Sequence, residues 1–376
     1  MPAASTSAST HPVQYTEYGI PIRNLWHMLL YAWNEAPIKT HWSMENVEYA
    51  PTLDALLASI LAKLIEQRMR IGLGRSYVTQ NQSIRGVRGD IKFAESLKQH
   101  TFERGEAYCE YHQYSANMPK NQIIRSTLMR LIQTGNFGHD RTQAERLRHT
   151  LRRLTRSLDG IDLMELNLDF IRRQQLDHND NDYRLMLAIC ELILQRQMPI
   201  EAMGQYALPA IERDALILYN VYERFVANFY HIHLKGYTVK SQSRLSWHAK
   251  FENPYLPSMQ PDLIIQHNNS GEIIILDTKF TAKSLVESEW GREVFDSSHL
   301  YQLYAYLSSQ NHVSGAHQKA AGILLYPAAH YKLSESIELQ DHVIRIECVD
   351  LAAPWQDIEG YLLNLVTNMV KNKSQL

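Results

Sequence analysis

The sequence predicts a mixed α/β protein, with a mostly helical N-terminal domain that contains a β-rich segment, followed by a C-terminal α/β domain. Helical periodicity dominates about the first 200 residues and is interrupted only at about residues 75–114. Residues 199–212 contain two prolines and one glycine, a composition typical of a junction between domains. Beyond the junction the pattern changes to the order α-β-β-α-β, which is typical of a mixed α/β domain of about 170 residues.

Apolar residues at helical spacing predict the elements of the N-terminal domain, which we place at residues 20–205. Residues 1–19 are small and polar and lack the apolar core of a signal peptide, so we expect a disordered lead there. The segment from Ile20 to Ala36 is rich in aromatic residues and predicts a buried helix. A helix is also expected from Pro51 to Leu73, because proline fits the first helical turn. Further helices are expected at residues 121–135, 144–158 and 181–198.

Residues 75–114 have a different pattern. They alternate loosely between polar and apolar residues, and Gly86 and Gly89 interrupt the alternation. We therefore expect strands and turns, arranged as a projecting hairpin. Glycines permit a tight exposed turn, and arginine suits planar contacts with carboxylate or phosphate groups. Arg85 and Arg88 at this turn are candidate contacts for a partner, and a solvated turn is the alternative.

Composition argues against several classes of protein. The formal net charge is −2, so nucleic-acid binding would need a local basic patch rather than a global positive charge. Cys109, Cys190 and Cys348 are far apart and form no CxxC pair, which favours a reducing, cytoplasmic location. No apolar run reaches about 18 residues, so no membrane span is expected. The histidines are scattered, which argues against a zinc site.

The segment MQPDLIIQHNNSGEIIILDTKF, from Met259 to Phe280, contains the strongest candidate site. Asp262 starts an apolar strand, the residues HNNSG supply a turn, and the partner strand ends with Asp277 and Lys279. The partner strand is apolar without alternation, as expected for a strand covered on both faces. Asp277 and Lys279 are two residues apart and therefore share one face, and the hairpin returns Asp262 to the same end.

Two carboxylates at one edge of a sheet repel each other unless a cation lies between them. Hard oxygen ligands with an incomplete shell suit Mg²⁺, which keeps water molecules and accepts phosphate oxygens. A neighbouring lysine would orient or deprotonate a water molecule, or neutralise charge on a pentavalent phosphate. Asp262, Asp277 and Lys279 are therefore candidate catalytic residues, with both aspartates as metal ligands. An ordinary hairpin with charged ends is the alternative.

A second, similar triplet includes Asp90 and Lys92, in the sequence GDIKF. No Pro-Asp strand precedes this triplet and no apolar run leads into it. We therefore expect no catalytic role for Asp90 or Lys92.

The helix expected at residues 297–309 adds two candidates. Gln302 and Tyr306 are four residues apart, so they share one helical face and can hydrogen-bond to a lysine, a phosphate or a base. Ser297 or Ser298 is the expected N-cap of this helix.

A helix is also expected at residues 212–236. Its Glu223 lies at the margin of an apolar stripe. It is a candidate further metal ligand, and a solvated or salt-bridged glutamate is the alternative. Basic residues nearby are either a local phosphate-binding patch or ordinary surface residues. They are Lys235, Lys240, Arg244, Lys250, Lys283 and Arg292.

These motifs resemble a known family. The chain is similar to the PD-(D/E)xK nuclease superfamily with its Q-x-x-x-Y helix, because it contains PD, then an apolar strand with DTK, and then QLYAY. More closely, the chain from about Ile20 onward resembles the McrC-like nuclease subunits of McrBC-type (type IV, 5-methylcytosine-dependent) restriction systems. The segments that carry this resemblance are IPIRNLWHMLLYAW, SIRGVRGDIKF, NQIIRSTL, LYQLYAYL and GILLYP.

The resemblance implies functions for the candidate residues. It places Asp262, Asp277 and Lys279 on the catalytic triplet of a restriction-endonuclease-like domain at residues 206–376, and Gln302 and Tyr306 on the Q-x-x-x-Y helix. Glu223 matches the acidic residue of the first helix only loosely.

The family also implies a partner, a McrB-like AAA+ GTPase hexamer that recognises modified DNA and translocates it. This chain contains no G-x-x-x-x-G-K-[ST] motif, so GTP is expected to bind to the partner.

We therefore expect an Mg²⁺-dependent endonuclease subunit that cleaves double-stranded DNA. Its N-terminal domain would dock on the motor and stimulate GTP hydrolysis, with Arg85 and Arg88 entering the ring. Two alternatives stay open. The chain could be a stand-alone nuclease whose N-terminal half binds DNA, although we identify no basic recognition helix there. It could also be a scaffold with a degenerate nuclease domain.

Overall fold

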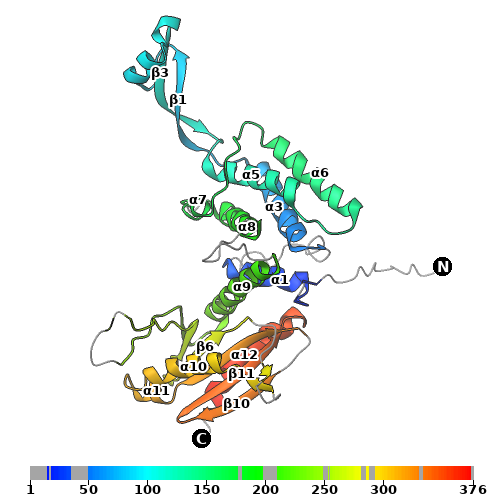
Figure 1. Ribbon diagram of the computed structural model, residues 1–376, viewed down its shortest axis with the longest axis vertical. Coiled ribbons are helices and arrows are strands. Elements are labelled where there is room, and N and C mark those ends of the chain that lie inside the picture. The colour runs from blue at the N-terminus through cyan, green and yellow to red at the C-terminus, as the bar shows by residue number, and fades with distance from the viewer. Residues whose placement is uncertain are drawn as a thin grey trace, which may run out of the picture. The chain divides into compact units, whose positions relative to one another are not determined.

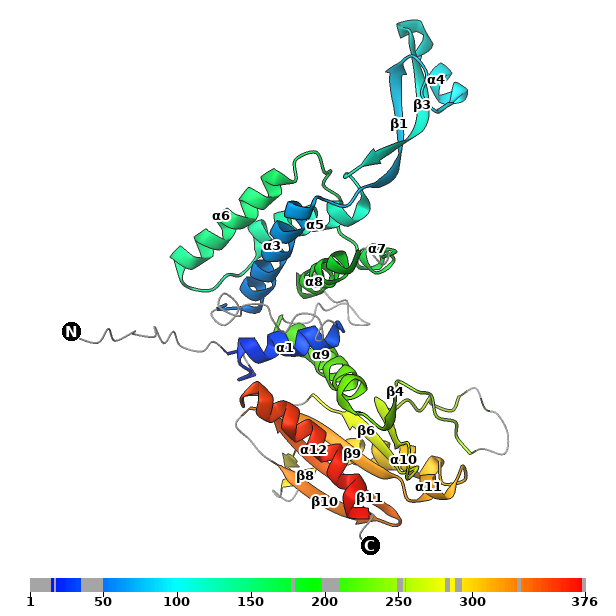
Figure 2. The same cartoon turned by 180° about the vertical axis from the view of Figure 1, so that it is seen from behind.

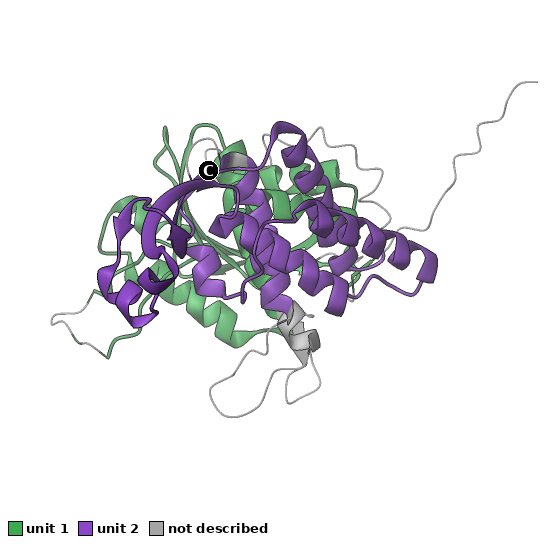
Figure 3. Cartoon of the chain, turned by 90° about the horizontal axis from the view of Figure 1, so that it is seen from above, with its two compact units in different colours: residues 1–50, 199–376 green, residues 51–198 purple. Residues whose placement is uncertain are grey.

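A computed structural model of the chain describes residues 15–34 except 17, 50–176, 180–197, 210–248, 253, 255–280, 285–287, 293–329 and 333–373. The chain forms two compact units (Figure 3). We call residues 1–50 and 199–376 the sheet unit, and residues 51–198 the helical unit. Most of the expected lead and of the expected junction at 199–212 lies outside the described residues.

Four helices pack against one another to form the helical unit (Figures 1 and 2). They are α3 (Leu53–Ile71), α5 (Pro119–Thr134), α6 (Arg141–Ser157) and α8 (Asn181–Gln197), and the short α7 (Leu168–Arg172) packs on α8. All four long helices were predicted. Side-chain caps fix where two of them begin, because Thr52 accepts a hydrogen bond from the backbone of Ala55, and Asp140 caps α6 in the same way.

The β-rich segment expected at residues 75–114 is a three-stranded antiparallel sheet. β1 (Ser76–Arg85) pairs with β3 (Glu106–Ser115) along its whole length, and the short β2 (Asp90–Ile91) pairs with the other edge of β3. Figure 1 shows this sheet extending away from the helices of its unit. The short helix α4 (Phe93–Lys98) and the 3₁₀ turn η2 (Phe102–Arg104) were not predicted, and they lie between β2 and β3.

Six strands of the sheet unit form a mixed sheet in the order β10-β11-β9-β6-β5-β4. β6 pairs in parallel with β9, and β9 with β11, while the other neighbours are antiparallel. The strands are β4 (Tyr237–Ser241), β5 (Leu263–His267), β6 (Ile273–Thr278), β9 (Ala321–Ala328), β10 (Ser334–Leu339) and β11 (His342–Asp350). β4 was not predicted, nor was the separate pair β7 (Leu285–Glu287) and β8 (Glu293–Phe295).

Helices cover both faces of this sheet. α10 (Ser297–Ser309) lies in front of it in Figure 1, and α12 (Trp355–Lys373) lies in front of it in the reverse view of Figure 2. Every residue of β6 is buried, which confirms the prediction of a strand covered on both sides. Gly322 of β9 permits the close approach of α10, because a Cβ there would lie 2.9 Å from a side-chain carbon of Leu303. No described helix is long and apolar enough to cross a membrane.

The N-terminal helix α1 (Ile22–Ala32) belongs to the sheet unit, so the prediction that places residues 20–50 in the N-terminal domain is wrong. Its aromatic face packs on α9 (Ala210–His233), where the ring of Tyr31 contacts Phe225 and Phe229 edge-on. Asn24 also donates a 2.7 Å hydrogen bond to the carbonyl of Leu351. The apolar face of α1 is thus buried against elements that are distant in sequence. The second division between the units, at residues 198 and 199, lies near the predicted boundary at 205.

Candidate active site

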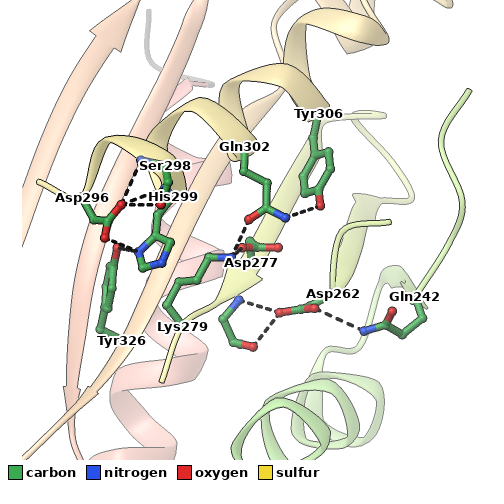
Figure 4. Close-up of polar contacts among 11 residues, drawn as sticks. Gln242, Asp262, Asp277, Lys279, Asp296, Ser298, His299, Gln302, Tyr306 and Tyr326 are labelled. Carbon is green, nitrogen blue, oxygen red and sulfur yellow. Dashed lines mark hydrogen bonds and ion pairs between the residues drawn. The ribbon is translucent and has the colours of Figure 1, made fainter. Parts of the chain in front are cut away.

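The β5–β6 hairpin brings Asp262 and Asp277 to the same end of the sheet. Leu263 pairs with Leu276, so Asp262 just before β5 lies opposite the end of β6 that carries Asp277. One carboxylate oxygen of Asp262 accepts hydrogen bonds from the backbone N–H and the hydroxyl of Thr278, at 2.7 and 2.6 Å (Figure 4). Both aspartates are buried, at 7% and 3% exposure. The orientation of Asp262 is therefore fixed by the strand that carries Asp277.

The two carboxylates lie close enough to affect each other's charge. Burial raises the pKa of Asp277 to about 6, and the negative charge of Asp262 adds to this effect. The ammonium of Lys279 opposes it, with Nζ 2.6 Å from Oδ2 of Asp277. One lysine therefore balances only part of the negative charge at this end of the sheet.

Lys279 begins a short chain of polar contacts that ends on α10. Its Nζ donates a 2.6 Å hydrogen bond to Oε1 of Gln302, and Nε2 of Gln302 donates to the hydroxyl of Tyr306 at 2.8 Å (Figure 4). The geometry confirms that Gln302 and Tyr306 share one helical face and that this face meets the lysine. The predicted N-cap is wrong, because Asp296 caps α10 by accepting from the backbone N–H groups of Ser298 and His299. A carboxylate accepts such bonds more strongly than a serine hydroxyl does.

Glu223 of α9 is linked to the same site through Gln242. The side-chain amide of Gln242 donates to Oε1 of Glu223 and, at 3.2 Å, to Oδ1 of Asp262. Burial and the charge of Asp262 raise the pKa of Glu223 to about 6. Tyr219, one turn earlier on α9, also lies near these groups. Burial raises the pKa of its phenol, and the negative charges of Asp262 and Glu223 raise it further. Glu223 is thus beside the two aspartates.

Mg²⁺ is the metal ion expected at the two aspartates. Among the described residues no three His, Cys, Asp or Glu side chains form a group that could hold a metal ion together. The buried pair of aspartates nevertheless suits Mg²⁺, which is often bound through one or two carboxylates and otherwise keeps its water. The raised pKa of Asp277 indicates negative charge that a cation would balance. The residues present therefore fit an open, water-containing Mg²⁺ site.

Other sequence-predicted residues lie elsewhere. Arg85 ends β1 in the helical unit, and Arg88 stacks over the ring of Tyr111 at 4.3 Å from its centre. Lys92 of the second triplet forms a 3.0 Å ion pair with Glu110 of the neighbouring strand, which gives it a structural partner. Of the predicted basic patch, three residues are described and exposed, and three lie outside the described residues. The described ones are Lys235, Lys240 and Arg244; the others are Lys250, Lys283 and Arg292.

Sequence reasoning missed several features of functional interest. Gln242 and Thr278 hold Asp262, but neither residue type signals such a role on its own. The helix α6 was recognised, but its charge was overlooked. It carries six arginines and a single acidic residue, and its apolar side chains, such as Leu151 and Leu154, are buried. Counting the charges on that segment would have identified a basic helix in the N-terminal half.

Comparisons with known proteins agree with the resemblance seen in the sequence. A family model described as McrBC 5-methylcytosine restriction system component matches residues 6–327. The chain is 27% identical over 356 residues to the type IV methyl-directed restriction enzyme EcoKMcrBC of Escherichia coli K12, which covers 94% of this chain and 99% of that protein.

One solved structure has a similar fold. It is a refined half-complex from a tetradecameric assembly of Thermococcus gammatolerans McrB AAA+ hexamers with bound McrC. The match has a TM-score of 0.53 at 15% sequence identity and covers 93% of this chain and 76% of the other. At this level of identity the match supports a common fold.

Proposed function

The chain belongs to the McrBC 5-methylcytosine restriction system component family, and we propose that it is the Mg²⁺-dependent DNA endonuclease subunit of such a system. One observation carries the proposal. Asp262, Asp277 and Lys279 meet at one end of the central sheet, where Gln302 of α10 holds the lysine and Tyr306 holds Gln302. This arrangement has the chemistry needed for hydrolysis of a phosphodiester.

Each residue has a definite task in this proposal. Asp262 and Asp277 would hold Mg²⁺, with Glu223 beside them, and the bound ion would supply positive charge to the scissile phosphate and to a water molecule. Lys279 would orient the attacking water or stabilise negative charge that develops on the phosphate. Gln302 fixes the ammonium of Lys279, and Tyr306 fixes the amide of Gln302. Thr278 holds one carboxylate oxygen of Asp262 in place.

The test of this function is Asp277→Asn, which keeps the size of the side chain and removes one ligand charge. We expect Mg²⁺-dependent DNA cleavage to fall by at least about a hundredfold while folding and assembly with the partner are retained. Cleavage at the wild-type rate by this variant in Mg²⁺ would exclude the site.

We also propose a partner, an AAA+ hexamer similar to the McrB hexamers of the Thermococcus complex. The partner, and not this chain, would bind GTP. The segment that leads from β1 to β2 supports the proposal, because it follows Arg85 and carries Arg88 and two glycines with positive φ, Gly86 and Gly89. Glycine adopts this backbone at low cost, so the chain can change direction at both positions. An exposed turn of this kind suits insertion between subunits.

The basic face of α6 favours a second function, direct contact of the helical unit with DNA. Arg141, Arg146 and Arg156 are exposed, and none of their side chains forms an ion pair or hydrogen bond with another described residue. Each arginine that neutralises a phosphate contributes about 0.9 to the slope of log affinity against log salt concentration.

Two triple variants test this second function. Replacing Arg141, Arg146 and Arg156 by glutamine should reduce the slope by up to about 3 if they bind the backbone of duplex DNA. Replacing Lys235, Lys240 and Arg244 in the sheet unit provides a comparison of equal charge. An unchanged slope for the α6 variant would exclude DNA binding by this helix.

A further inference from the structure

Gln242 has an unusual backbone for its residue type. It follows the edge strand β4 and has a φ of +50°, in the left-handed region that side chains other than glycine rarely adopt. Its backbone N–H donates to the carbonyl of Asp262 at 3.0 Å, and its own carbonyl accepts from the side chain of Gln260 at 2.9 Å. The residue is therefore held on both sides next to Asp262.

The side chain of Gln242 makes use of this position. Its amide nitrogen donates to one oxygen of Glu223 and to Oδ1 of Asp262. Only the nitrogen of the amide can face two carboxylates, because the amide oxygen would repel both. Strained backbone that is kept in place by surrounding contacts is characteristic of functional sites.

The two carboxylates depend on Gln242 to different degrees. Asp262 is already oriented by two hydrogen bonds from Thr278 to its other oxygen. Among the described residues, Gln242 is the one that donates a side-chain hydrogen bond to Glu223, and the like charge of Asp262 repels this carboxylate. Without the amide, the longer and more flexible glutamate would turn away from the aspartates.

We propose that Gln242 is a positioning residue that holds Glu223 beside Asp262, where Glu223 adds a third negative charge next to the Mg²⁺ site. This inference rests on the proposed function and deepens it. Residues that orient metal ligands typically change metal affinity by about tenfold or more when they are replaced. Glycine at position 242 would keep the left-handed backbone and remove the side chain with its amide, so it separates positioning from folding.

The chain offers a matched control. Gln340, in the turn between β10 and β11 of the same unit, has a φ of +55° and lies in a different hairpin from the site. We expect Gln242→Gly and Gln340→Gly to leave the urea midpoint of unfolding unchanged or slightly higher, because both relieve the same backbone strain. Only Gln242→Gly should weaken Mg²⁺ binding, by about tenfold, as measured by calorimetry on the full-length chain without DNA.

A double-mutant cycle tests whether Gln242 acts through Glu223. In a Glu223→Gln background, Gln242→Gly should cause no further loss of Mg²⁺ affinity. Equal Mg²⁺ affinity of Gln242→Gly and Gln340→Gly would overturn the inference, and so would an undiminished effect in the Glu223→Gln background. In both of those outcomes, Mg²⁺ binding by the wild type and the loss of this binding in Asp277→Asn would still support the proposed function. A wild-type chain that binds no Mg²⁺ would overturn both.

Discussion

Gln302→Ala is the substitution that tests the geometry of the site most directly. In the wild type, Lys279 lies between two oxygens, with Nζ 2.6 Å from Oε1 of Gln302 and 2.6 Å from Oδ2 of Asp277. The variant keeps the aspartate and removes the second oxygen. A hydrogen bond to a charged group contributes about 1.5–3 kcal/mol. Gln302 is exposed, so water replaces part of this contribution, and the lower value of about 1.5 kcal/mol applies.

This free energy corresponds to about a tenfold decrease in the rate constant of cleavage. Tyr306→Phe removes a contact one step further from the lysine, a neutral hydrogen bond of 2.8 Å, and we expect a decrease of about fivefold or less. Tyr301→Phe is the control, because Tyr301 is on the same helix and 70% exposed. The assay is single-turnover cleavage of modified duplex DNA with the AAA+ partner and GTP present.

The expected order of effects follows from the chain of contacts. Gln302→Ala should reduce cleavage more than Tyr306→Phe, and Tyr301→Phe should have no effect. Wild-type cleavage by Gln302→Ala would refute the reasoning, because Lys279 would then be positioned without α10. A larger effect of Tyr306→Phe than of Gln302→Ala would refute it as well, since the tyrosine hydroxyl reaches the lysine only through Gln302.

Three further predictions concern other parts of the chain. Lys279→Ala should abolish cleavage, whereas Lys92→Ala should leave the cleavage step intact because its ion pair is with Glu110; the reverse result would mean that the wrong triplet was chosen. Burial lowers the pKa of His27 to about 4, so the folded state resists protonation, and its contribution to stability is complete above pH 6.5 and lost as the pH falls toward 4. His27→Phe keeps the stack on Trp355, and its free energy of unfolding should fall less than that of the wild type between pH 6.5 and 4, by at most about 3 kcal/mol. Urea unfolding followed by tryptophan fluorescence measures this difference, since all six tryptophans lie in the sheet unit. An equal loss of stability in the variant and the wild type would contradict the prediction. Replacing Arg85 and Arg88 by alanine should weaken partner binding or the stimulation of GTP hydrolysis, and full stimulation at unchanged affinity would move the docking surface elsewhere.

The central hairpin could be predicted because local signals agreed with one another. Turn residues separate two apolar runs, and a strand pair with such a turn has few alternative registers. The pairing of Leu263 with Leu276 then places Asp262 and Asp277 at one end without any long-range information. The contact between Gln302 and Tyr306 was similarly local, since it depends only on helical spacing.

Other features depend on long-range contacts that no local pattern contains. The aromatic face of α1 indicated burial, but the sequence could not show that its partner is α9, about 200 residues later. Gln242 comes after an edge strand that was not predicted, and its role arises only because β4 pairs with β5. Position relative to a distant strand, rather than residue type, makes this glutamine part of the candidate site.

The topology of the sheet unit explains why its polar residues gather at one place. β6 and β9 are parallel, and α10 lies between them in the chain and crosses back over one face of the sheet. In parallel sheets, side chains at the carboxyl ends of the strands meet the start of the connecting segment, where loops leave room for a ligand. Asp277 and Lys279 lie at that end of β6, and Gln302 faces them from α10. The antiparallel partner β5 adds Asp262 at its beginning, and β4 adds Gln242 at its end. A mixed sheet therefore gathers more polar groups at one end than a purely parallel sheet would, because the antiparallel strand β5 begins at that end and β4 ends there. This argument applies to the sheet unit alone, and it accounts for a complete candidate site there without any residue of the helical unit.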